Sequence, residues 1–106
     1  MAEPQPVIVA NSTAIKTVKV YSHITTFQIP INTTYLQLPS VESSEITFTN
    51  DASSADTIYL GDLGVTSSNG YPIAKGGTVT INIENLDKLY AVTASGTATL
   101  DVIVLK

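Results

Sequence analysis

The 106-residue sequence contains no cysteine, no arginine and no tryptophan. Without cysteine there can be no disulfide, no thiolate metal ligand and no cysteine nucleophile. Without arginine there is no planar guanidinium to bind phosphate or guanine with two hydrogen bonds. The basic residues are five scattered lysines, which form no continuous stripe. We therefore do not expect nucleic acid among the partners.

Charge of either sign is also scarce, because charged residues make up 13% of the chain and the net charge is −4. A typical soluble domain carries about 25% charged residues. Threonine, serine and asparagine replace them, and β-branched threonine favours strands over helices. No apolar run approaches the roughly 20 residues of a membrane helix. Residues 1–6 lack the basic and apolar regions of a secretory signal, so we expect synthesis and assembly in the cytoplasm without a membrane partner.

Short segments with alternating apolar and polar residues run through most of the chain. Pro30 places the segment 23–31 at a sheet edge or strand end, because proline cannot donate to the ladder. The glycine- and proline-containing segment 62–77 is expected to be irregular, and one helical turn is expected at 86–89. The expected strands are 7–10, 17–21, 23–31, 35–38, 45–50, 57–61, 78–83, 89–94 and 97–105.

Strands at this spacing, with turn residues between them, predict an all-β protein with a single β-sandwich. We assign residues 7–106 to the sandwich and residues 1–6 to an extended N-terminal arm. An immunoglobulin-like order is the first alternative, since residues 85–92 resemble the corner before a strand in such sandwiches. A jelly roll is the second alternative.

Two parts of the chain are candidate contact surfaces. In the N-terminal segment, Pro4 and Pro6 would lower the entropy cost of ordering an arm on a partner, and Val7 and Val9 would supply apolar contacts. The last strand is apolar on both faces, because Ile103 and Leu105 lie opposite the core-facing residues. A strand buried on both sides predicts contact with another subunit, so we expect a homo-oligomer.

No arrangement of residues predicts catalysis. His23 is the only histidine, and no nucleophile elbow or HExxH string accompanies it. Asp51, Asp56 and Asp62 have the positions of turn residues rather than of a calcium loop. We expect neither an enzyme nor a bound metal or cofactor.

A different function would use the long segment 62–77. Tyr59, Asn69 and Tyr71 could form a ligand-binding loop for a host glycan or receptor. The absence of tryptophan makes a sugar-stacking platform less expected than a protein contact.

Residues 46–106 resemble small β domains of tailed-phage virion proteins. The similar strings are TIYLG at 57–61, GYPIAKGGTVTI at 70–81 and NLDKLYAV at 85–92, followed by the ASGTA turn and an apolar last strand. The resemblance implies a non-enzymatic structural protein of the virion. It would be a capsid decoration (cement) protein, often trimeric, that binds the major capsid protein and stabilises the shell. A head or tail fibre component that binds a glycan or receptor is the alternative.

Overall fold

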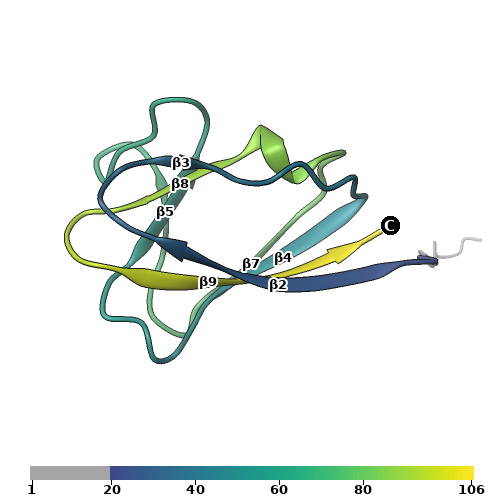
Figure 1. The fold of residues 1–106 in the computed structure, drawn as a ribbon, viewed down its shortest axis with the longest axis horizontal. Helices are drawn as coiled ribbons and strands as arrows, with labels where there is room; N and C mark the ends of the chain where they lie inside the picture. Colours follow the sequence, from purple (N-terminus) through teal and green to yellow (C-terminus); the bar gives the residue numbers. More distant parts are fainter. Residues whose placement is uncertain (1–19) are drawn as a thin grey trace, which may run out of the picture.

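The computed structural model describes residues 20–106, which form two packed antiparallel sheets (Figure 1). This confirms the predicted all-β sandwich. A 3₁₀ turn, η1 (Leu86–Lys88), lies at the predicted helical position. The strands are β2 (Ile24–Ile31), β3 (Leu36–Gln37), β4 (Glu45–Asn50), β5 (Ile58–Gly61), β6 (Tyr71–Ile73), β7 (Thr78–Ile81), β8 (Tyr90–Thr93) and β9 (Ala98–Leu105).

The strand order is that of a jelly roll rather than an immunoglobulin domain. One sheet has the order β2-β9-β4-β7 and the other β3-β8-β5-β6. The pairs β2·β9, β3·β8, β4·β7 and β5·β6 are nested inside one another, as in one long hairpin rolled into two layers. This is the double-sheet winding of a jelly roll. The immunoglobulin-like alternative is therefore replaced by the second alternative.

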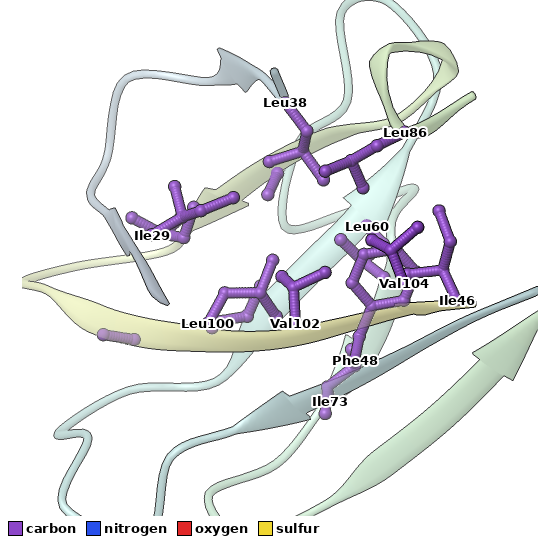
Figure 2. Close-up of a cluster of buried hydrophobic side chains, with 14 residues drawn as sticks. Ile29, Leu38, Ile46, Phe48, Leu60, Ile73, Leu86, Leu100, Val102 and Val104 are labelled. Carbon is purple, nitrogen blue, oxygen red and sulfur yellow. The ribbon is translucent and has the colours of Figure 1, made fainter. Parts of the chain in front are cut away.

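The core lies between the inner faces of the two sheets (Figure 2). Strand β4 shows how the sequence builds it, since Ile46, Phe48 and Asn50 are fully buried while the residues between them are half-buried. Strand β9 has the same period, with Leu100, Val102 and Val104 buried. Side chains that alternate in this way turn one face of each sheet toward the other.

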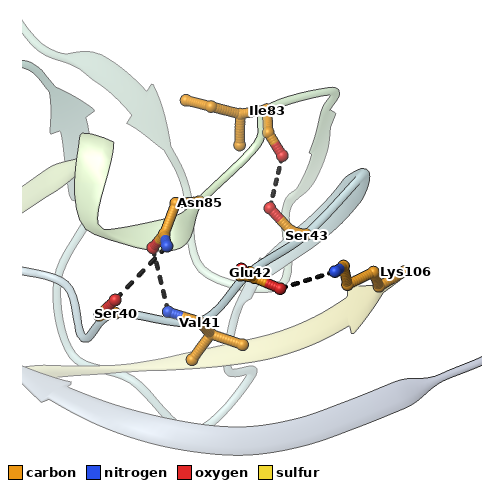
Figure 3. Close-up of polar contacts among 7 residues, drawn as sticks. All are labelled: Ser40, Val41, Glu42, Ser43, Ile83, Asn85 and Lys106. Atoms are coloured by element: carbon orange, nitrogen blue, oxygen red, sulfur yellow. Dashed lines mark hydrogen bonds and ion pairs between the residues drawn. The ribbon is translucent and has the colours of Figure 1, made fainter.

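Two connections are tied together at one end of the sandwich (Figure 3). Asn85 caps η1 by accepting a hydrogen bond from the backbone N–H of Asp87, and the same Oδ1 accepts one from Val41 N–H at 3.0 Å. The Ser43 hydroxyl donates to the carbonyl of Ile83. These bonds fix the β3–β4 connection against the β7–β8 connection, and so hold the two sheets together at this end.

Two of the sequence predictions concern strands that lie at the edges of the sheets, and one of them is wrong. Strand β2 is an edge strand, as Pro30 predicts. The expectation that residues 62–77 are wholly irregular is wrong, because Tyr71–Ile73 form β6 and pair with β5. This strand is three residues long, contains Pro72 and pairs on one side only, so its period-2 signal is too short to detect.

The predicted arm (residues 1–6), the strand at 7–10 and most of the strand at 17–21 lie outside the described residues. The candidate contacts at Pro4, Pro6, Val7 and Val9 lie outside them too and stay predictions.

Candidate functional site

The outer face of the sheet β2-β9-β4-β7 is broad and nearly free of charge. Because paired residues share a face, the register places threonines and aliphatic residues on it, with Glu45 and Asp101 as its ionisable side chains. The residues of this outer face are Ile24, Thr26, Gln28, Pro30, Glu45, Thr47, Thr49, Thr78, Thr80, Thr99, Asp101, Ile103 and Leu105. None of the five lysines is among them.

Ile103 and Leu105 lie on this outer face, as their alternation with the core residues predicts. Ile103 is flanked by Thr26 and Thr47 on the neighbouring strands, and Leu105 is flanked by Ile24 and Glu45. Ile24 is 68% exposed, whereas Ile103 and Leu105 are half-buried. The three aliphatic side chains therefore form an apolar cluster at one end of the face.

Several polar side chains of this face have hydrogen-bond partners. The hydroxyls of Thr47 and Thr80 lie 2.9 Å apart, and those of Thr49 and Thr78 lie 3.0 Å apart. The Tyr21 hydroxyl donates to Oε1 of Glu45 at 2.9 Å, and burial together with this bond raises the pKa of Tyr21. A surface whose hydroxyls are paired loses less hydration on docking than one with free polar groups.

The loop 62–70 packs on the outer face of the second sheet over β5. Val65 is 4% exposed and packs down toward β5, where a Cβ built on Gly61 would lie 2.6 Å from its Cγ2 atom. Gly70 closes the loop, since its added Cβ would lie 2.6 Å from Cβ of Tyr59. Glycine at both positions lets Val65 and the loop backbone approach the sheet.

Replacing Gly70 with alanine should therefore destabilise the protein by about 1–3 kcal/mol, the usual range for overpacking. Urea unfolding of Gly70→Ala measures the loss. Ser68→Ala in the same loop is the control, because this exposed change should stay within about 0.5 kcal/mol. Equal stability of the two variants would show that the loop does not pack as tightly as the structure indicates.

The three residues of the alternative ligand loop do not share a site. Tyr59 lies on the outer face of the second sheet, half-buried under the loop 62–70. Tyr71 pairs with the buried Leu60 and so faces the inner side, where it is 60% exposed at the sheet edge. Oδ1 of Asn69 accepts a hydrogen bond from Thr66 N–H at 2.8 Å and shapes the loop. The alternation of side chains predicts which face of a strand each residue occupies. It does not predict how residues on the two sides of a loop lie relative to one another.

An apolar groove opens between the sheets beside β6 and β7, and the sequence does not predict it. Its volume is about 320 Å³, and its exposed lining is wholly apolar. Tyr71 stands at its mouth. The lining residues are Leu60, Gly61, Tyr71, Val79, Ile81 and Leu89. Val79 and Ile81 point inward from β7 but remain half-buried, because the edge of the sandwich leaves them uncovered.

Glu42 and Lys106 form an ion pair. His23 is exposed near the ion pair of Lys106 and Glu42, whose N–O distance is 2.6 Å. Bonding to Lys106 lowers the pKa of Glu42. In residues 20–106, no three histidine, aspartate or glutamate side chains converge on a metal position.

The sequence does not predict the acidic pair of Asp51 and Asp101. Burial and a hydrogen bond to Asp51 raise the pKa of Asp101, while hydrogen bonds from the backbone and hydroxyl of Ser53 lower the pKa of Asp51. Gln28 also donates to Asp101 at 2.8 Å. Sequence patterns could not reveal this pair, because it depends on the strand register.

Comparison of the chain with family models, with curated proteins and with solved structures found no match. Within residues 20–106, no helix has the length and apolar character needed to cross a membrane.

Proposed function

We propose that the protein is a non-enzymatic structural protein of a virion, which binds the major capsid protein as a decoration protein and stabilises the shell. The observation that carries this proposal is the outer face of the sheet β2-β9-β4-β7. Its apolar cluster of Ile24, Ile103 and Leu105, its paired threonine hydroxyls and its low charge suit a broad protein contact. Burial of this face against the shell would add non-covalent contacts without any chemical step.

Two further observations support the same function. Residues 46–106 resemble small β domains of tailed-phage virion proteins, which implies this role. The jelly-roll winding is also common in viral capsid domains. This second point rests on the fold alone. It supports the proposal less than the outer face does, because one fold serves many functions.

A glycan-binding function receives less support from the geometry. Sugars require convergent hydrogen-bonding groups beside an aromatic face. Tyr71 borders a groove whose exposed lining is wholly apolar, and Tyr59 lies on the other face of the same sheet. The described residues therefore favour a protein partner.

The variant Ile103→Lys tests the proposed contact face. A lysine in the apolar cluster should weaken binding to empty shells at least tenfold, because its charge must be desolvated on docking. Folding should persist, since the side chain points away from the core. Co-sedimentation with shells of the virus that encodes the chain measures the affinity.

The matched control is Leu63→Lys, which introduces the same charge at an exposed leucine of the loop 62–70. Its affinity for the shells should equal that of the wild-type chain. Equal affinity of Ile103→Lys and wild type would contradict the assignment of this face.

A further inference from the structure

Within residues 20–106, the unpaired edge of β7 and the apolar groove beside it form one continuous surface. β7 is a terminal strand of its sheet, so alternate backbone N–H and C=O groups point away from β4. Val79 and Ile81 of the same strand line the groove, together with Leu60 and Tyr71 from the opposite sheet. A strand added along β7 would place every second side chain over this groove.

This edge differs from the other three edges of the described sandwich. Proteins commonly block edge strands with proline, with charge or by keeping them short. β2 contains Pro30, β6 contains Pro72, and β3 has only two residues. β7 reads Thr-Val-Thr-Ile and has neither proline nor charge. An unblocked edge beside an uncovered apolar groove is suited to β-augmentation, in which an extended segment adds a strand.

The chain itself contains a segment of the matching chemistry. Val7, Ile8, Val9 and Ala10 are uncharged and mostly β-branched, and Pro6 precedes them. When such a segment is extended, Val7 and Val9 share one face and Ile8 takes the other. Two valines at this spacing match an apolar groove that runs beside one edge strand.

We propose that residues 7–10 of a second copy of this chain pair with β7 and insert Val7 and Val9 into the apolar groove. Donor segment and acceptor groove are different surfaces, so each copy can give one segment and receive another. Such a contact closes into a ring when the rotation between copies allows it. The contact uses a different surface from the proposed shell-binding face, and either proposal can fail without the other.

Strand directions favour a second copy over the chain's own segment. Every strand pair described is antiparallel, and the end of β7 lies at the same end of the sheet as the start of β2. An antiparallel strand on β7 would therefore finish at the opposite end. The added strand would also lie about 19 Å from β2, because four spacings of about 4.8 Å between neighbouring strands separate the two. The same chain would have to cross the whole outer face to begin β2, whereas a second copy has no such constraint.

Solution mass gives the first test, by light scattering of the full chain. We expect wild type to exceed the 11.2 kDa of one chain and Val9→Asp to return to it. Ile8→Asp, the matched control on the other face of the segment, should keep the wild-type mass. A wild-type chain that stays monomeric at all concentrations, or a Val9→Asp variant with unchanged mass, would overturn the proposal.

Disulfide trapping gives a second test that does not depend on a loss of assembly. The natural chain has no cysteine, so a ¹⁵N-labelled Val9→Cys chain can be mixed with an unlabelled Tyr71→Cys chain and oxidised. We expect a mixed disulfide of twice the single-chain mass, because the bond requires Cα atoms about 4.4–6.8 Å apart. Ile8→Cys with Tyr71→Cys should give much less.

The double variant Val9→Cys/Tyr71→Cys separates the two possible sources of the segment. Covalent oligomers support exchange between copies. A disulfide formed within one chain, without increase in mass, would show that the groove holds the chain's own segment and would overturn the proposal. No mixed disulfide at all would overturn it as well.

Discussion

Phe48→Ala should lower the free energy of unfolding by about 3–5 kcal/mol, the usual cost of removing a buried aromatic side chain. Phe48 is fully buried on β4, between Val102 of β9 and Val79 of β7 in the register. Domains of this kind have a total stability of about 5–15 kcal/mol, so the variant should lose a large part of it. Urea denaturation followed by circular dichroism measures the change.

The control for this variant is Val79→Ala, which changes the cross-strand neighbour of Phe48. Val79 is only half-buried beside the groove, so its truncation should cost about 1 kcal/mol. A larger loss for Val79→Ala than for Phe48→Ala would mean that the core does not lie between the two sheets as described.

Asn50→Asp should be strongly destabilising, and its effect should grow with pH. The Asn50 side chain is fully buried, and its Nδ2 donates to the carbonyls of Asp56 at 2.8 Å and Ile73 at 2.9 Å. These bonds hold the loop after β4 against β6. An aspartate there would direct a carboxylate oxygen at two carbonyl oxygens. Burial would also raise its pKa above the unfolded value of about 3.9.

The direction of the pH dependence follows from that raised pKa. The folded state binds the proton more tightly than the unfolded state, so the variant is least destabilised below about pH 4. Its stability then falls as pH rises through the folded-state pKa. Each unit of elevation adds about 1.4 kcal/mol to the loss above that pKa. Urea unfolding at pH 4 and pH 8 measures the difference.

Asn50→Ala separates this charge effect from the loss of two hydrogen bonds. It leaves the same carbonyls without donors, which costs about 1–3 kcal/mol for each unsatisfied group. Its loss relative to wild type should be the same at both pH values, since alanine does not titrate. An Asn50→Asp variant with the same pH dependence as Asn50→Ala would contradict the burial of this side chain.

Strand positions could be predicted from the sequence because each long strand has one buried face. The expected strand 45–50 matches β4 residue for residue, and the expected 97–105 differs from β9 by one residue. Pro30 also predicted an edge strand correctly. These features depend on residues within one segment, where side chains alternate with period 2.

Strand pairing could not be predicted, because alternation reveals a strand's faces but not its neighbours. For this reason the immunoglobulin-like and jelly-roll orders both remained open until the nested pairing was known. The apolar groove depends on the same information, since Val79 and Ile81 resemble core residues unless β7 is known to be an edge. The placement of Ile103 and Leu105 on an outer face needed only the alternation of side chains along β9, so the sequence predicted it.

Electron cryomicroscopy of empty shells mixed with the full chain tests directly whether the chain binds the shell through this sheet. We expect density on the shell surface into which the jelly roll fits with the sheet β2-β9-β4-β7 turned toward the major capsid protein. Ile103 would lie in that contact and the loop 62–70 would point away from it. Shells that remain bare at saturating protein, or density with the opposite sheet against the shell, would contradict the account.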